Sequence, residues 1–157
     1  SYVSPKNIQL VTSHGIYTEA EFRARHAIYL EAYNKIVNIE GRTMVDMALH
    51  QILPAALHYT RSLCESITSK KALGISCRAE SSLAQQLSNA TDSLYDGIEK
   101  LKTDLNAIPC EPSECAKYCH NTITADMENL RKEADLLEQL TDKSYWPYPT
   151  YSDLLFY

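Results

Sequence analysis

Apolar residues recur at intervals of three or four through most of this sequence, and polar residues fill the positions between them. That spacing gathers the apolar side chains on one side of a helix, whereas a strand would place them at every second position. The pattern therefore predicts an all-α fold. The expected helices cover residues 18–37, 39–73, 79–107 and 113–142.

The first two expected helices carry recognisable start and stop signals. Thr18 and Glu21 have the spacing of a capping box, in which each side chain bonds the backbone N–H of the other residue. Gly74 suits the end of the second helix, because glycine readily takes the left-handed conformation found there. Gly41 lies at the junction, so the two helices could be nearly continuous. The residues that recur at helical spacing in the first helix are Phe22, His26, Tyr29, Leu30, Tyr33 and Val37.

Pro54 lies inside the second expected helix, where proline removes a backbone hydrogen bond and its ring clashes with the preceding turn. We therefore expect a kink near residues 50–54. The same helix is dense in apolar and small residues around Met44 and Met47, which is typical either of a core or of a helix interface. Two further prolines separate the last two helices, and their short connection predicts an antiparallel hairpin.

The two ends of the chain differ from its middle. Residues 1–17 mix proline, asparagine, serine and glycine, which predicts an irregular lead-in. Residues 143–157 are rich in aromatic residues but contain two prolines, so we expect an extended tail lying across a groove. The 157 residues fit a single domain. The prediction is an antiparallel bundle of about four helices over residues 18–142.

Charge and cysteine content narrow the class of protein. A net charge of −5 without a basic stripe argues against binding to nucleic acid or to an anionic membrane. No apolar run reaches the roughly 18 residues of a membrane span, and no signal peptide opens the chain. Five cysteines without a secretory signal favour reduced thiols and a cytoplasmic location. The start at Ser1 is expected of a processed chain or of a piece of a longer one.

Three groups of residues are candidates for chemistry. Cys110, Cys115, Cys119 and His120 could bind a metal ion, but a second ligand pair is missing, which favours buried or incidental thiols. His50, His58 and Tyr59 are the candidates for an effector pocket. The acidic residues of the last helix have the spacing of a solvated face. The sequence contains neither a glycine-rich phosphate loop nor a G-x-S-x-G motif.

Three segments together resemble one family. They are EFRARHAIYLEAYNKIVNIEGRTMVDMALHQILPAALHY (21–59), SITSKKALG (66–74) and WPYPTYSDLLFY (146–157). These segments resemble the C-terminal region of type III glutamine synthetases. The positions that carry the resemblance are Met44, Asp46, Met47, Pro54, Trp146, Pro147, Pro149, Tyr151, Asp153 and Leu154.

The resemblance implies a non-catalytic piece of a larger enzyme. Family members join ammonia to glutamate at the expense of ATP, with Mg²⁺ or Mn²⁺ in a preceding catalytic domain. This sequence has none of the motifs of that domain, so no catalytic, cofactor-binding or metal-binding residue carries over. The matching positions are expected to be structural or interfacial.

We therefore expect a helical domain that supports the catalytic domain and the contacts of a homo-oligomer. The implied partners are the rest of the synthetase chain and neighbouring subunits. An alternative is a regulatory platform that binds a partner protein or a small effector. A third, weaker hypothesis is a metal-binding helical protein built on Cys115, Cys119 and His120.

Overall fold

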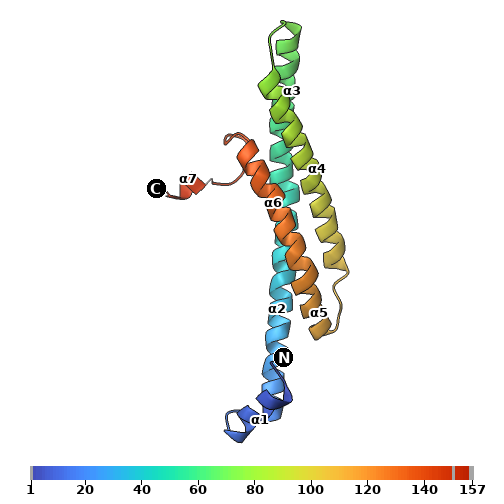
Figure 1. Cartoon of the computed structure of the whole chain (residues 1–157), viewed down its shortest axis with the longest axis vertical. Helices are drawn as coiled ribbons and strands as arrows, with labels where there is room; N and C mark the ends of the chain where they lie inside the picture. The colour runs from blue at the N-terminus through green and yellow to red at the C-terminus, as the bar shows by residue number, and fades with distance from the viewer. Residues whose placement is uncertain (1, 150, 156–157) are drawn as a thin grey trace.

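One long helical rod runs the length of the structure, and other helices pack along it (Figure 1). It consists of α2 (Glu19–Met47), the π-helical turn η1 (Ala48–Ile52) and α3 (Leu53–Ala72), which follow one another without a break (Figure 1). The computed structural model describes residues 2–149 and 151–155. The two helices expected over residues 18–37 and 39–73 are thus one, as the position of Gly41 had left open. Gly41 lies inside α2, where an added Cβ would meet the Leu105 side chain at 2.9 Å.

The predicted signals at the two ends of this rod are confirmed. At the start, the Glu21 N–H donates to Thr18 Oγ1 at 3.3 Å, and the Thr18 N–H donates to Glu21 Oε2 at 2.9 Å. These hydrogen bonds lower the pKa of the Glu21 carboxyl. At the other end Gly74 has a φ of 72°, and the Ile75 N–H donates to the Lys70 carbonyl at 2.9 Å. Both ends therefore satisfy backbone groups that a bare helix would leave without partners.

Where a kink was expected near residues 50–54, the structure has the π turn η1 within a continuous helix. The Leu53 N–H donates to the carbonyl of Ala48, five residues back instead of four. Pro54 follows immediately, at the second position of α3. A wider turn before a proline relieves the clash between its ring and the preceding carbonyl, so the rod continues beyond it.

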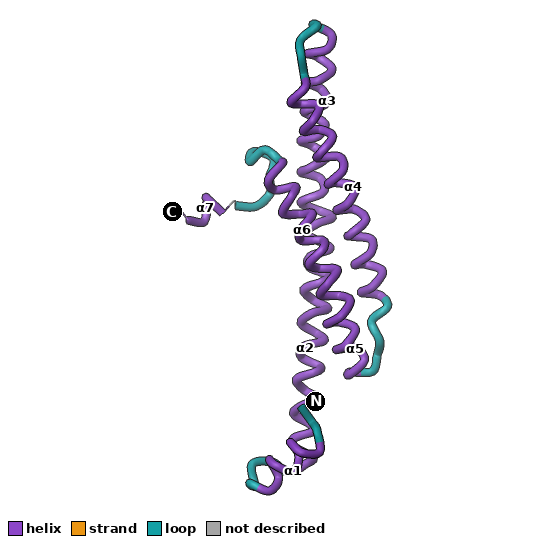
Figure 2. Tube along the Cα trace, in the orientation of Figure 1, coloured by secondary structure: helices purple, strands orange, loops and turns teal. Residues whose placement is uncertain are grey.

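Two more helical segments pack along the rod. α4 (Arg78–Asn106) returns antiparallel to it, and α5 (Pro112–Tyr118), the π turn η2 (Cys119–Ile123) and α6 (Thr124–Leu140) run back again (Figures 1 and 2). All regular elements within residues 2–149 and 151–155 are helical. The prediction of an all-α antiparallel bundle is confirmed. The turn η2, where the Thr124 N–H reaches the Cys119 carbonyl, had no signal in the sequence pattern.

The core lies between α4 and the α5–α6 segment, with the rod closing one side. Its largest fully buried side chains are Leu87, Leu94, Ile98, Leu101, Cys119, Ile123, Leu130 and Leu137. The rod contributes smaller residues, among them Ala48 and Ala56, which let the other helices approach closely. None of the helices in the described part of the chain is both long and apolar enough to cross a membrane.

A short helix replaces most of the irregular lead-in expected before residue 18. α1 (Pro5–Ser13) begins at Ser4, whose hydroxyl accepts from the Asn7 N–H at 3.3 Å. α1 folds back on the beginning of α2 below the bundle (Figure 2). The Tyr2 ring stacks on Phe22 at 4.9 Å, and Phe22 is buried. Ser4 as the N-cap and Pro5 at the first helical position are a helix-start signal, and the irregular lead-in expected for residues 1–17 did not take it into account.

The C-terminal segment is only partly extended. Turns follow α6, and the short helix α7 (Tyr151–Leu155) stands where extended chain was expected. Trp146 and Tyr148 pack against the core, with ring centroids 6.5 Å apart. Lys143 forms an ion pair with Asp153. Trp146 and Tyr148 are therefore docked as predicted, while the side chains of Tyr151, Phe156 and Tyr157 lie outside the described residues.

Candidate functional site

A groove opens where α2, α6 and the C-terminal segment meet. It has a volume of about 480 Å³. α2 contributes Met44 and Met47, and the C-terminal segment contributes Trp146, Tyr148 and Pro149. The residues from α2 and from the C-terminal segment are about 100 positions apart in the sequence, yet they line the same groove. Both segments are among those that carry the family resemblance.

The groove is apolar inside and charged at its edge. Glu40 of α2 and Asp135 and Glu138 of α6 supply three carboxylates, and Arg131 supplies one cation, 3.7 Å from Asp135. An apolar interior with an acidic edge can bind an apolar chain segment or an amphipathic small molecule.

Tyr148 lines this groove, and its side chain carries a buried polar atom. Its hydroxyl oxygen is buried and has no hydrogen-bond partner among the described residues. Burial raises the pKa of the Tyr148 hydroxyl, and the charge of Asp46 adds to the effect. A buried hydroxyl without a hydrogen-bond partner costs free energy, so this atom is an unsatisfied polar group beside the groove.

The remaining predicted interface residues lie outside the groove. Asp46 is exposed and faces His50, with 3.6 Å between the carboxylate and Nε2. Pro54 is half-buried in the first turn of α3, while Pro147 and Leu154 are exposed. The structure describes the backbone of Tyr151 within α7, but its side chain lies outside the described residues. Asp153 contacts Lys143.

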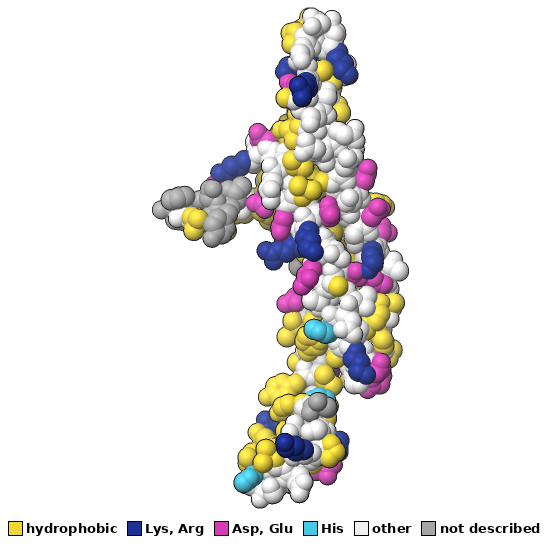
Figure 3. Space-filling model, in the orientation of Figure 1, with side chains coloured by type: hydrophobic (Ala, Val, Ile, Leu, Met, Phe, Trp, Pro, Cys, Tyr) yellow, Lys and Arg dark blue, Asp and Glu magenta, His cyan; other side chains and the backbone are white. Residues whose placement is uncertain are grey.

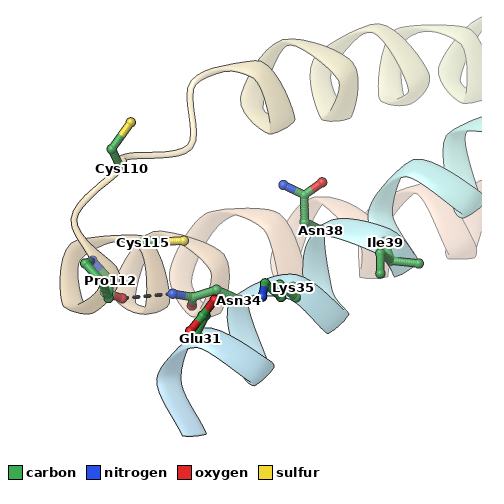
Figure 4. A pocket seen from close by; sticks show the side chains of 8 residues that line it. All are labelled: Glu31, Asn34, Lys35, Asn38, Ile39, Cys110, Pro112 and Cys115. Atoms are coloured by element: carbon green, nitrogen blue, oxygen red, sulfur yellow. Dashed lines mark hydrogen bonds and ion pairs between the residues drawn. The ribbon is translucent and has the colours of Figure 1, made fainter. Parts of the chain in front are cut away.

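A second hollow, of about 570 Å³, lies between α2 and α5 (Figure 4). Asn34 Nδ2 donates to the Pro112 carbonyl at 2.9 Å, while Asn34 Oδ1 is buried and accepts no hydrogen bond from the described residues. Glu31 and Lys35 stand at the α2 edge of this hollow, and Cys115 lines it from α5. The contact fixes the beginning of α5 against α2, and nothing in the local sequence pattern around Asn34 predicted it.

The cysteines do not assemble the metal site considered above. Cys115 and Cys119 are buried with their Sγ atoms 3.9 Å apart, but His120 is exposed. Burial raises the pKa of the Cys119 thiol to about 11, which disfavours the thiolate that a metal needs. Within the part of the chain that the structure describes, no three His, Cys, Asp or Glu side chains gather as a metal site would require.

The candidates for an effector pocket do not converge either. His50 borders a small hollow together with Arg42, Asp46 and Lys102, and neither His58 nor Tyr59 takes part in it. Tyr59 instead packs against Tyr145 in a tilted arrangement, with the ring centroids 5.2 Å apart.

A charged cluster that sequence reasoning missed joins α4, α5 and α6. Lys100 contacts the Asp126 carboxylate and lies 3.1 Å from Asp104 Oδ2, and the Tyr118 hydroxyl donates to Asp104 at 3.3 Å. Only 6% of Asp126 is exposed. Burial raises the pKa of Asp126, whereas hydrogen bonds with Asp126 and Lys100 lower the pKa of Asp104. Asp126 had no sequence signal, because an aspartate at a helical spacing is normally solvated.

Comparison with known proteins connects this architecture with one family. Residues 1–71, which include α1, α2, η1 and nearly all of α3, match the family described as glutamine synthetase C-terminal domain. A glutamine synthetase of Butyrivibrio fibrisolvens is 35% identical over 99% of this chain and 23% of its own length.

Two further relatives show the same coverage. A type-3 glutamine synthetase of Dictyostelium discoideum is 28% identical over 98% of this chain and 22% of its own length. A glutamine synthetase of Bacteroides fragilis is 26% identical over 99% of this chain and 22% of its own length. This chain thus spans less than a quarter of the length of each relative. It resembles the glutamine synthetase C-terminal domain family over residues 1–71 and is similar to glutamine synthetases over nearly its whole length.

Proposed function

We propose that this chain is a non-catalytic helical domain of a glutamine synthetase, which supports the catalytic part of the enzyme and its assembly into an oligomer. The observation that carries the proposal is the groove between α2, α6 and the C-terminal segment. Four positions that carry the resemblance line it, namely Met44, Met47, Trp146 and Pro149. An open apolar groove on an elongated bundle is typical of a surface that receives another polypeptide segment.

In this proposal the rest of the synthetase carries out catalysis, and the helical bundle holds it in position. Reacting glutamate, ammonia and ATP would be the work of the rest of the synthetase, which would also hold the Mg²⁺ or Mn²⁺ ions. The bundle would position that part by accepting one of its segments in the groove. The acidic edge formed by Glu40, Asp135 and Glu138 favours a segment that carries Lys or Arg beside its apolar residues. We place the whole assembly in the cytoplasm, in keeping with the free cysteines.

The test uses the longer synthetase that contains this region. Light scattering would report the size of the oligomer, and ammonia-dependent ATP turnover would report activity, with and without residues 1–157. Since a deletion can unfold its neighbours, a point variant is needed as well. Met47→Lys places a charge in the groove at a side chain that is already 38% exposed.

The matched control is Leu57→Lys, which charges an exposed leucine of α3 outside the groove. We expect Met47→Lys, but not Leu57→Lys, to reduce both the oligomer and the turnover. If both variants keep the full oligomer and full turnover, the groove is not the contact that the proposal requires.

The buried Tyr148 hydroxyl favours a second candidate, in which the groove binds a small effector. A metabolite with an apolar part and a hydrogen-bonding group would give that hydroxyl the partner it lacks. Calorimetry with glutamine and with glutamate, on the parent chain and on Tyr148→Phe, separates the two functions. Heat that is saturable and is lost in Tyr148→Phe supports the effector. The absence of saturable heat from both metabolites removes it.

A further inference from the structure

α2 carries apolar residues on two sides, and only one of these sides faces the bundle. Val37 and Gly41 are buried against the other helices. Tyr29, Ile36 and Ile39 are exposed by 62%, 55% and 64%. At 100° per residue the two groups lie on the order of 150° apart around the helix axis. The residues that recur at helical spacing in the sequence, Tyr29 and Val37 among them, therefore lie on both sides of α2.

The exposed side has the spacing of a coiled-coil seam. Its positions alternate by three and four residues, and all of them are exposed; we call them the outer face of α2, and they are Tyr29, Ala32, Ile36, Ile39 and Thr43. Such a 3–4 alternation keeps a straight row of side chains against a second helix. The row is about 20 Å long at 1.5 Å per residue. Figure 3 shows hydrophobic side chains on the surface between the N-terminal arm and the bundle, where α2 leaves its neighbours.

The charges beside this row indicate what covers it. Lys35 and Arg42 flank the row on one side, and Glu40 flanks it on the other. We call the side with Lys35 and Arg42 the first flank and the side with Glu40 the second flank. In a parallel pair of helices, a residue on the first flank of one helix meets a residue on the second flank of the other helix, five positions later in the sequence. Lys35 would therefore meet Glu40 of the second copy, twice by symmetry. An antiparallel pair would bring the first flanks of both copies together and so place lysine and arginine against each other.

We propose that a second copy of this chain packs in parallel along the outer face of α2. The inference rests on the assembly role proposed above and specifies one contact within it. Because the buried side of α2 faces away from this row, two bundles can come together without displacing their own α4 or α6 helices. The groove at Trp146 shares Ile39 and Thr43 with this row and Glu40 with its flank, and its other lining residues stay open for a different segment.

Sedimentation velocity across micromolar concentrations tests the pair through a charge exchange. Lys35→Glu and Glu40→Lys each replace two attractions with two repulsions, and each should weaken the dimer by roughly tenfold. The double variant Lys35→Glu/Glu40→Lys should restore the parent dissociation constant to within about threefold. The existing pair between Lys35 and Glu31 cannot explain such a rescue, because the double variant does not restore it.

A cross-linking experiment fixes the direction. In a background of Cys64→Ser and Cys110→Ser, which removes both exposed thiols, Ile36→Cys should form a symmetric disulfide dimer on mild oxidation. Equivalent row positions face one another only when the helices are parallel and in register. Leu57→Cys, an equally exposed position on α3, is the control and should not cross-link.

Three outcomes would overturn the inference. One is a monomer at all concentrations, and another is a dimer that ignores the charge exchange. The third is an Ile36→Cys thiol that the longer synthetase protects from maleimide but never cross-links, since another part of that chain would then cover the row. The proposed function is judged separately: if removing residues 1–157 dissolves the oligomer while the charge exchange does nothing, the assembly role stands and this contact fails.

Discussion

Removing the Lys100 ammonium should destabilise the fold in a way that depends on pH. Lys100→Met leaves Asp104 and Asp126 side by side with only the Tyr118 hydroxyl as a partner. Breaking a fully buried ion pair costs about 3–5 kcal/mol. Lys100 itself is 61% exposed, so solvent screens part of the interaction. We therefore expect a loss of about 1–3 kcal/mol in the free energy of unfolding at pH 7.

The sign of the pH dependence follows from the two carboxyl groups. Burial raises the folded-state pKa of Asp126 above its unfolded value of about 3.9, so ionisation of Asp126 opposes folding as the pH rises through that range. Lys100 limits this loss, and without it the pKa rises further. Asp104 has a lowered pKa, so its contribution is present above about pH 4 and disappears below. Both effects make the variant differ most from the parent near neutral pH.

Urea unfolding of the parent and the variant at pH 7 and at pH 4 measures the difference. The gap should be smaller at pH 4 than at pH 7, because the raised pKa of Asp126 means that lowering the pH protonates this carboxyl before an ordinary aspartate. Lys102→Met is the matched control, because Lys102 pairs with Glu99 on the exposed side of α4 and should cost only a few tenths of a kcal/mol. An equal loss at both pH values, or a loss no larger than that of Lys102→Met, would refute the assignment of Asp126 as a buried charge that depends on Lys100.

Three further outcomes are expected. Thr18→Ala removes one half of the capping box and should lower the free energy of unfolding by about 1 kcal/mol, while Thr68→Ala, an exposed threonine inside α3, should change it little in the same urea titration. Leu94→Ala deletes a fully buried side chain and should cost about 3 kcal/mol; a loss under 1 kcal/mol would mean that α4 does not form the core. At pH 8 a thiol reagent should modify exposed Cys64 at once but Cys119 only on unfolding, because burial raises the pKa of the Cys119 thiol to about 11; equal rates would contradict its burial.

The ends of the long rod show what local sequence can determine. The capping box at Thr18 and the glycine at position 74 each act through hydrogen bonds to residues only a few positions away. Their geometry is therefore written in a short stretch of chain, and it was predicted correctly. The same holds for the helical spacing itself, because side chains three and four positions apart meet within one helix.

Features that depend on which helices pack together could not be predicted from local sequence. Both sides of α2 carry apolar residues, so the sequence does not distinguish them. Val37 is buried and Ile36 is exposed because α4 and α5 pack against only one of these sides. Asp126 became a buried carboxylate because α6 presents it to Lys100 of α4. Both outcomes are set by contacts between segments far apart in the chain.

The sequence by itself determined the helical periodicity, the capping box at Thr18, the glycine at position 74 and the resemblance to glutamine synthetases, because each can be read from residues close together in the chain. The tertiary structure alone decided that Met47 and Trp146 line one groove and that an apolar row on α2 is left facing outward. Those facts depend on the packing of whole helices, where the burial of one face is fixed by the partner it meets and not by its own residues.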